Sequence, residues 1–165
     1  MVGYEMTSVS IRTARDSDAD DLTQLTAQLG YAVEAEVLRE RLSRILGRSD
    51  QRFLVAEMGG HPVGWLHAIL AEFVEAERTV VIAGLVVSGS HRRHGIGRVL
   101  MERAEGWARE QGCSVVRLWS SSTRTETHRF YEALGYTHIK TQYSFAKSLD
   151  PARQDAVRTF VPRVK

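Results

Sequence analysis

The stretch "TVVIAGLVVSGSHRRHGIGRVL", residues 79–100, joins the most hydrophobic segment of the chain to a helix through a glycine-containing bend. Residues 79–87 are dense in β-branched side chains and show no helical stripe, which is typical of a central strand covered on both faces. From Ile96 an apolar stripe at helical spacing runs to about Gln111, where Gly112 predicts the end of a helix. With the apolar run at 114–121 behind it, the stretch predicts a strand–helix–strand crossover.

The flanking segments extend this unit into a mixed α/β fold. Upstream, alternation and apolar stripes predict a strand over 8–14, helices over 15–30 and 34–47, and hairpin strands over 53–58 and 63–70 around Gly59 and Gly60. Downstream, they predict a helix over 124–135 and a terminal hairpin or bent strand over 136–147. The order β-α-α-β-β-β-α-β-α-β-β predicts one sheet of about seven strands, flanked on both faces by about four helices.

Composition limits the classes of protein and partner. The 165 residues suffice for one domain, which we expect over 1–149, followed by a polar, basic tail over 150–165. The formal net charge of +2 argues against bulk electrostatic binding to nucleic acid or to an acidic membrane. The single cysteine, Cys113, excludes an intramolecular disulfide framework. With neither a secretory signal nor an apolar run of membrane-spanning length, we expect a soluble, cytoplasmic protein without nucleic-acid or membrane partners.

The bend at 88–98 has the chemistry of a phosphate site. A strand that turns into a helix leaves several backbone N–H groups unpaired, and the helix dipole favours anionic oxygens there. Gly95 and Gly97 let the backbone turn and come close to a ligand, and Arg92 and Arg93 add charge at the rim. The spacing R-x-x-G-x-G is neither the dinucleotide fingerprint nor the lysine-bearing P-loop. An ordinary capped helix with a solvated basic turn is the alternative interpretation of this motif taken alone.

A second motif, "TETHRFYEALGY", follows about thirty residues later, and the two together resemble the GNAT superfamily of N-acetyltransferases. That family carries V-x-x-x-x-R-x-x-G-x-G/A, matched by Val87, Arg92, Gly95 and Gly97, and a later F-Y-x-x-x-G-F/Y. The second motif is matched by Phe130, Tyr131, Gly135 and Tyr136. The order of elements also looks like the family's fold, so the resemblance covers residues 9–149. The R-x-x-x-H-R-F-Y form at 124–131 most resembles members that acetylate small amines.

The resemblance implies acetyl-CoA as cosubstrate, no metal, and a role for each matched segment. Backbone groups of the central strand would pair with the pantetheine arm, and amides of the bend would hold the pyrophosphate. Tyr131 would be the general acid for the leaving thiolate, since a phenol of pKa about 10 can donate a proton to a thiolate of comparable basicity. Ser121 stands where relatives often place an asparagine that holds the cofactor. The expected cofactor-binding residues are Leu85, Val86, Val87, Arg92, Arg93, His94, Gly95, Ile96, Gly97, Arg98, Ser121, Thr127 and His128.

The sequence departs from the family at the general base. An alkyl amine of pKa near 10 is about one part in a thousand neutral at pH 7, so it must lose a proton before it attacks. Many relatives use a glutamate on the central strand, but residues 81–85 here read Val-Ile-Ala-Gly-Leu. Several side chains remain as alternatives, each acting through water: Glu72, Glu75, His67 and His128.

The acceptor is expected to be the primary amine of a small molecule, which attacks the thioester directly through a tetrahedral intermediate. In the family, residues that face the substrate come from the loop between the first two helices and from the final hairpin, and acidic side chains suit a cationic amine. The candidates are Tyr31, Glu34, Glu72, Glu75 and Tyr143. Two alternatives stay open: a protein lysine or N-terminal acetyltransferase, and a non-catalytic acetyl-CoA-binding module. A homodimer is also an expectation, with Phe160 and Val161 of the tail as candidates for its interface.

Overall fold

The protein is described by a computed structural model over residues 8–160, in which two compact units are resolved. The first unit ends at Leu118 and the second begins at Trp119. Val161 and the end of the predicted tail lie outside the described residues, as do residues 1–7.

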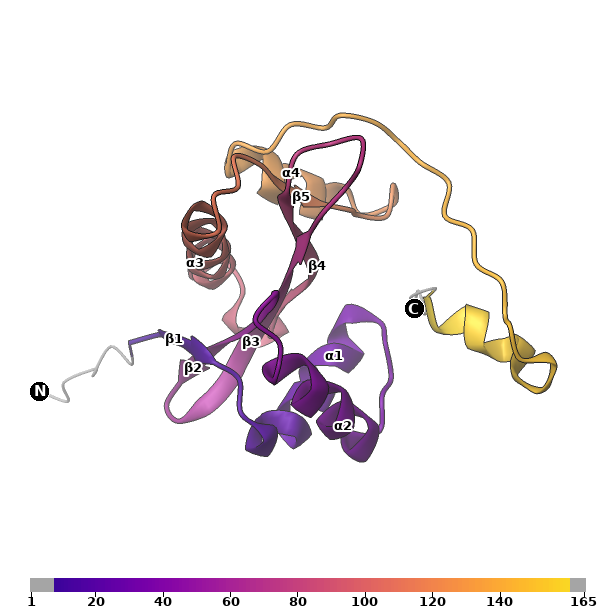
Figure 1. Ribbon diagram of the computed structural model, residues 1–165. Coiled ribbons are helices and arrows are strands. Elements are labelled where there is room, and N and C mark those ends of the chain that lie inside the picture. The colour runs from indigo at the N-terminus through magenta and orange to yellow at the C-terminus, as the bar shows by residue number, and fades with distance from the viewer. Residues whose placement is uncertain (1–7, 161–165) are drawn as a thin grey trace, which may run out of the picture. The chain divides into compact units, whose positions relative to one another are not determined.

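The first unit is built on a sheet of five strands in the order β1-β2-β3-β4-β5 (Figure 1). These are β1 (Ser10–Thr13), β2 (Gln51–Met58), β3 (His61–Ala71), β4 (Thr79–Val87) and β5 (Val116–Leu118). Adjacent strands from β1 to β4 run antiparallel to one another, and β5 runs parallel to β4. The β2–β3 hairpin turns at Gly59 and Gly60, whose φ angles of 59° and 82° are those of a type I′ turn.

Helices cover both faces of this sheet, as the sequence predicts. One face packs against α1 (Ala19–Leu29) and α2 (Ala35–Leu46), and the other against α3 (Ile96–Glu110), which contacts four of the strands (Figure 1). The sheet-facing stripe of α3 is fully apolar and includes Leu100, Ala104 and Trp107. Because both faces are covered, consecutive residues Leu54, Val55 and Ala56 of β2 are all buried.

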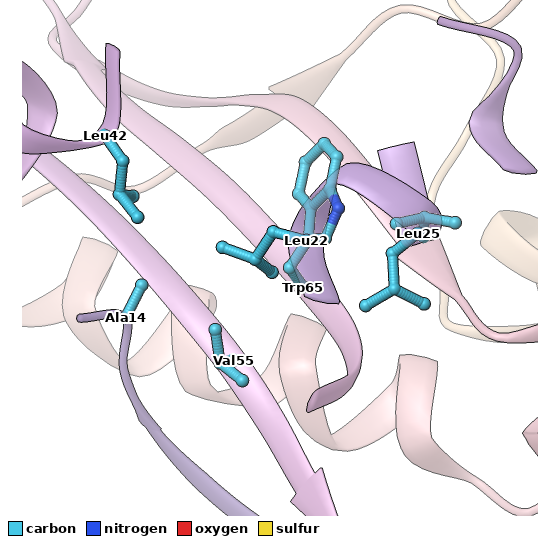
Figure 2. Close-up of a cluster of buried hydrophobic side chains, with 7 residues drawn as sticks. Ala14, Leu22, Leu25, Leu42, Val55 and Trp65 are labelled. Atoms are coloured by element: carbon cyan, nitrogen blue, oxygen red, sulfur yellow. The ribbon is translucent and has the colours of Figure 1, made fainter. Parts of the chain in front are cut away.

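The core between α1, α2 and the sheet is a cluster around Trp65 of β3 (Figure 2). Leu22 and Leu25 of α1 and Leu42 of α2 pack there with Val55 and Val86 of the strands. Phe53 stacks on Trp65 with ring centroids 5.2 Å apart. The Trp65 ring lies so close to Gly84 of β4 that a Cβ there would approach it to 2.7 Å. Gly84 is therefore required by packing, not by its backbone conformation.

Strand β4 carries a bulge in the middle of the sheet. His67 of β3 pairs with Gly84 and Ala68 pairs with Ile82, so Ala83 has no partner on β3. The ladder with β5 ends at the same level, with Ile82 opposite Leu118. From Ala83 to Val87, no strand in the described part of the chain pairs with the outer edge of β4. The bulge thus marks the point at which one edge of β4 becomes free.

The second unit contains α4 (Thr125–Ala133) and the 3₁₀ segment η3 (Pro151–Phe160). Helix α4 ends in a Schellman motif, in which the Tyr136 amide donates to the Tyr131 carbonyl and the Gly135 amide donates to the Glu132 carbonyl. Gly135 has a φ of 91°, as this motif requires. The rings of Tyr131 and Tyr136 meet edge to face at 5.9 Å, which is the apolar contact that often completes such a cap.

The mixed α/β class is confirmed, but the expectation of about seven strands is wrong for the described residues, which contain five. Residues 136–147, predicted as a terminal hairpin, form no ladder there. Tyr143 and Phe145 are 92% and 90% exposed, so the segment has neither the partner edge nor the covered face that stabilises a strand. The strand predicted over 114–121 is shortened to β5, because the chain turns at Ser121, whose carbonyl accepts from the Arg124 amide. The predicted domain boundary at residue 150 stays a prediction.

Candidate functional site

The turn after β4 begins with a hydrogen bond to β3 and then leaves the sheet. The Ser88 amide donates to the Val63 carbonyl at 2.8 Å, which closes the β3–β4 ladder. A short 3₁₀ turn, η2 (Gly89–His91), follows, and a chain of side-chain hydrogen bonds joins Ser88 to Ser90 and Ser90 to His91 at 3.0 and 2.9 Å. The segment from Arg92 to Gly95 beyond it is exposed.

Two left-handed residues shape the entry to α3. Arg93 has a φ of 64°, unusual for a residue with a Cβ, and Gly95 has a φ of 77° immediately before the helix. The first helical hydrogen bond runs from the Val99 amide to the Gly95 carbonyl. Within the described residues, the amides of Ile96, Gly97 and Arg98 have no hydrogen-bond partner. A helix N-terminus preceded by left-handed residues is a concave set of donors suited to anionic oxygens.

The basic side chains of the turn lie at its rim. Arg93, His94 and Arg98 are exposed, while the Arg92 Nε donates back to the Val87 carbonyl at 3.3 Å. The arginines therefore add positive charge around the amides without occupying them.

The free edge of β4 leads directly into this turn. Because Ser88 is hydrogen-bonded to Val63, the antiparallel alternation directs the backbone groups of Val86 and Gly84 toward β3. The N–H and C=O groups of Leu85 and Val87 therefore point to the outer edge, where the sequence predicts an extended arm to pair. Val86 is placed differently from its two neighbours: its backbone pairs with Trp65 and its side chain lies in the core.

A contact from α1 supports the turn, and sequence reasoning did not find it. The Gln28 Oε1 accepts a hydrogen bond from the Gly89 amide at 2.9 Å. This places the C-terminal end of α1 beside the C-terminal end of β4. An exposed glutamine on a helix gives no signal in the sequence; only the fold brings positions 28 and 89 together.

A second polar contact lies inside the sheet. The His67 Nε2 is 2.8 Å from the Gln51 Oε1, and its ring is 5.5 Å from the Phe53 ring. Burial lowers the pKa of His67 below its usual 6.5. His67 pairs with Gly84, so it stands beside the bulge at which the outer edge of β4 opens.

In the second unit, the predicted residues gather around the start and the middle of α4. The His128 Nε2 is 2.9 Å from the Ser121 carbonyl, and the Ser121 hydroxyl is 3.0 Å from that of Thr123. Thr127 is half-buried on the same helix. Burial raises the pKa of Tyr131 to about 12, against the opposing charge of Arg124. The phenol consequently keeps its proton at neutral pH.

The structure does not bring the predicted substrate residues together in the first unit. Tyr31 and Glu34 lie between α1 and α2, and the Gln28 contact puts that connection at the C-terminal end of β4. Glu72 and Glu75 lie in the β3–β4 connection, at the other end of β4, where Glu72 pairs with Arg78. Tyr143, in the second unit, is 92% exposed.

Over residues 8–160, no helix has the length and apolar character that crossing a membrane requires. The same range holds no cluster of three or more histidine, cysteine, aspartate or glutamate side chains placed to hold a metal ion.

Comparison with known proteins gives one family. Residues 18–136 match the family model described as the acetyltransferase (GNAT) family. An aminoglycoside N(6')-acetyltransferase type 1 of Acinetobacter haemolyticus is 25% identical over 146 residues, covering 86% of this chain and all of the relative. An uncharacterised N-acetyltransferase of Archaeoglobus fulgidus is 30% identical and covers 74% of this chain and 89% of its own length.

Solved structures agree on the fold. The aminoglycoside N-acetyltransferase AAC(6')-Iy in complex with CoA has a TM-score of 0.78 at 19% identity, covering 88% of this chain and 99% of that one. The aminoglycoside 6'-N-acetyltransferase AAC(6')-Ih of Acinetobacter baumannii has a TM-score of 0.76 at 20% identity, covering 87% and 100%. At these identities the likeness concerns the fold alone.

Proposed function

The chain belongs to the acetyltransferase (GNAT) family and is an N-acetyltransferase, and on that premise we propose that it transfers an acetyl group from acetyl-CoA to a primary amine of a small molecule. The observation that carries the proposal is the free outer edge of β4, which is followed, after the turn at 88–95, by the unpartnered amides at the start of α3. An extended arm with amide groups can pair with the edge of β4, and a diphosphate can bind to the amides at the start of α3.

The residues present fit acetyl-CoA. Leu85 offers an outward N–H and C=O to the pantetheine arm and Val87 an outward N–H, while the Val87 carbonyl accepts from the Arg92 Nε at 3.3 Å. The amides of Ile96, Gly97 and Arg98 offer donors to the pyrophosphate. At Gly95 a Cβ would meet no atom within 4 Å, so the turn is open on that side. When bound, acetyl-CoA supplies a thioester as the acyl donor.

Tyr131 is the proposed general acid. Its phenol is protonated at neutral pH, because burial raises its pKa to about 12. The same ring also packs against Tyr136 in the cap of α4, so Tyr131 has a structural role as well. A catalytic test must therefore remove the hydroxyl and keep the ring.

A small-molecule acceptor is supported by relatives in two comparisons. Matching proteins of Acinetobacter haemolyticus and Stenotrophomonas maltophilia are named aminoglycoside N(6')-acetyltransferases. A solved structure of similar fold, AAC(6')-Iy, holds a bisubstrate analogue in which CoA is joined to acetylneamine. A water-soluble polyamine or amino sugar is the acceptor class that we expect.

The test combines acetyl-CoA binding by calorimetry with turnover of neamine, spermidine, an aminoalkylphosphonate and a lysine peptide. We expect binding and turnover of at least one small amine, and a fall in kcat of about 10²–10⁴-fold in Tyr131→Phe. Tyr136→Phe is the matched control, because it also keeps its ring. No binding would reject the family chemistry for this chain; binding without turnover would indicate a non-catalytic module, and turnover of the peptide alone a protein acetyltransferase.

A further inference from the structure

His67 is a partly buried histidine in the middle of β3, and the mechanism proposed above gives it no role. It lies on β3 on the face covered by α1 and α2, since it is two residues beyond Trp65, which packs there. Its described contacts are the Gln51 amide and the Phe53 ring, both from β2. A histidine held by one neutral hydrogen bond keeps its second nitrogen for another partner.

The contact with Gln51 determines the tautomer of His67, and so which of its nitrogens can accept a proton. The Gln51 Oε1 can only accept, so the His67 Nε2 carries the hydrogen and donates it at 2.8 Å. The His67 Nδ1 then carries the lone pair. In this tautomer the imidazole is a base at Nδ1, and the amide behind it fixes the plane of the ring.

The position of the ring matches the place where a base is needed. His67 pairs across the ladder with Gly84, over which the Trp65 ring lies. Ala83, the residue before Gly84, forms the bulge, and the ladder between β4 and β5 ends at Ile82. Residues 81–85 of β4 contain no carboxylate. His67 is thus the titratable side chain on β3 or β4 closest in register to the start of the free edge.

We propose that His67, in its Nε2–H tautomer, accepts through a water molecule the proton that the acceptor amine must lose. This inference rests on the function proposed above. One proton leaves the ammonium nitrogen through water to the His67 Nδ1, from which solvent later recovers it. The nitrogen lone pair then forms the C–N bond with the acetyl carbonyl carbon, and the carbonyl π electron pair moves to oxygen. When the carbonyl double bond forms again from this tetrahedral intermediate, the C–S bond breaks. The sulfur keeps the electron pair of the C–S bond and takes up one proton. The nitrogen loses its second proton in return, so the number of protons balances.

The surroundings of His67 leave it neutral and available. From β2 it meets Gln51 and Phe53, from β4 it meets Gly84, and the residues of α1 and α2 buried in this core are leucines and Ala19. The charged residues on either side of Gln51 have other partners: Arg52 stacks on Trp107 of α3, on the opposite face, and Asp50 pairs with Arg48. Burial therefore dominates, and it keeps the imidazole unprotonated at neutral pH.

The first test needs no turnover. Two-bond ¹H–¹⁵N spectra of the ring give the tautomer and the pKa of His67 in the free protein, assigned by the signal lost in His67→Gln. We expect the Nε2–H tautomer with a pKa below 6.5, and a pKa higher by at least about one unit in Gln51→Glu, whose carboxylate would face the Nε2–H group. An Nδ1–H tautomer would overturn the proposal.

The second test is the pH profile of kcat for the best acceptor among neamine, spermidine and an aminoalkylphosphonate. The wild type should lose activity on the acid side with the pKa seen by NMR, and Gln51→Glu should move that limb to higher pH. His67→Gln and His67→Asn should lower kcat at pH 7 by about 10²–10⁴-fold, less so at pH 9–10, where more of the amine is already neutral. His61→Gln, at an exposed position in the same hairpin, is the matched control.

The outcomes separate the two proposals. If the wild type turns over an amine and the acid limb persists unchanged in His67→Gln, the role of His67 is rejected while the acetyltransferase function stands. If the wild type binds acetyl-CoA but acetylates no amine, the proposed function fails, and the role of His67 fails with it. Gln51→Glu keeps the histidine, so a folding defect in the His67 variants does not remove the test.

Discussion

At the scale of single residues, the entry to α3 depends on one backbone conformation. Gly95 has a φ of 77°, which an L residue adopts at a cost of about 1–2 kcal/mol. Arg93, at 64°, already carries such a cost within the same turn. The loop therefore holds its amides at the expense of local backbone strain, as functional turns often do.

Replacing Gly95 by alanine is expected to weaken acetyl-CoA binding by about tenfold, since about 1.4 kcal/mol of strain would have to be overcome in the bound turn. Calorimetric titration with CoA measures this. Gly106→Ala is the control, because Gly106 lies inside α3 with a negative φ and open space around it. That substitution should leave the dissociation constant unchanged and raise the free energy of unfolding by about 0.5–1 kcal/mol. Equal affinities of Gly95→Ala and wild type would contradict the assignment of this turn.

A second residue-scale prediction concerns Gln28, which holds the Gly89 amide at 2.9 Å. In Gln28→Ala the turn loses its link to α1, so KM for acetyl-CoA should rise about two- to tenfold while kcat at saturation changes little, consistent with one hydrogen bond of about 0.5–1.5 kcal/mol. Steady-state kinetics over a range of acetyl-CoA concentrations measure both. Gln24→Ala removes an equally exposed glutamine from the same helix and should have no effect. An unchanged KM in Gln28→Ala would show that the turn holds its shape alone.

At the scale of elements, three helices end by the same device. Gly30 directly follows α1, and Gly112 and Gly135 lie two positions beyond the last residues of α3 and α4. Each has a left-handed φ and donates its amide back to the last turn. In all three the following residue makes the longer hydrogen bond of a Schellman motif. Helix α2 differs, because Gly47 has a φ of −76° and continues the right-handed backbone. The F-Y-x-x-x-G-Y segment thus has a structural reason for its glycine and its last tyrosine.

The strand pair β3–β4 is sensitive at Gly84. A Cβ there would lie 2.7–2.8 Å from the Trp65 ring, which is held in the core by Phe53 and the leucines of α1. Gly84→Ala should therefore lower the free energy of unfolding by about 1–3 kcal/mol, as overpacking does, measured by urea denaturation. Gly47→Ala is the control, with an ordinary contact at 3.8 Å and a right-handed φ. The two variants would unfold at the same urea concentration if Trp65 could move aside freely.

At the scale of the whole chain, a partly buried charge network ties the first strand to the start of α1. The Arg12 guanidinium donates to both carboxylate oxygens of Asp18 at 2.8 Å and to Glu57 at 2.6 Å. The Arg15 amide adds a further hydrogen bond to Asp18 at 2.7 Å. Burial of Asp18 opposes its ionisation, but these hydrogen bonds and the charge of Arg12 outweigh it and hold the pKa of Asp18 below its usual 3.8. The folded state therefore binds its proton less tightly than the unfolded state does.

The sign of the resulting pH dependence follows from that depressed pKa. The contribution of Asp18 to stability is complete above about pH 4 and is lost as the pH falls through the folded-state pKa. Asp18→Asn should lower the free energy of unfolding at pH 7 by about 1.5–3 kcal/mol and flatten the loss of stability between pH 4 and 2. Urea denaturation at several pH values measures both effects. Asp50→Asn removes the partner of Arg48 in a surface ion pair and should change both much less.

Most of the fold could be predicted from the sequence because it depends on the spacing of apolar residues and on glycines at turns and helix ends. The periodicity of apolar residues predicted α1, α2, the central strand β4 and α3. The glycines predicted the hairpin turn between β2 and β3 and the ends of three helices. The terminal hairpin that local patterns predict over 136–147 does not form. Its alternation is that of a strand, but a ladder also needs a partner edge, and pairing is a property of the tertiary structure.

The sequence alone determined the turn chemistry of this protein: glycines and arginines in fixed spacing after an apolar strand, and the motif that places it in its family. Such features act within a few residues, so they can be recognised along the chain. Only the tertiary structure decided that Ala83 forms a bulge, that Leu85 and Val87 face outward while Val86 does not, and that Gln28 and His67 stand beside that strand. These depend on register and on contacts between residues far apart in the sequence, which no local pattern specifies.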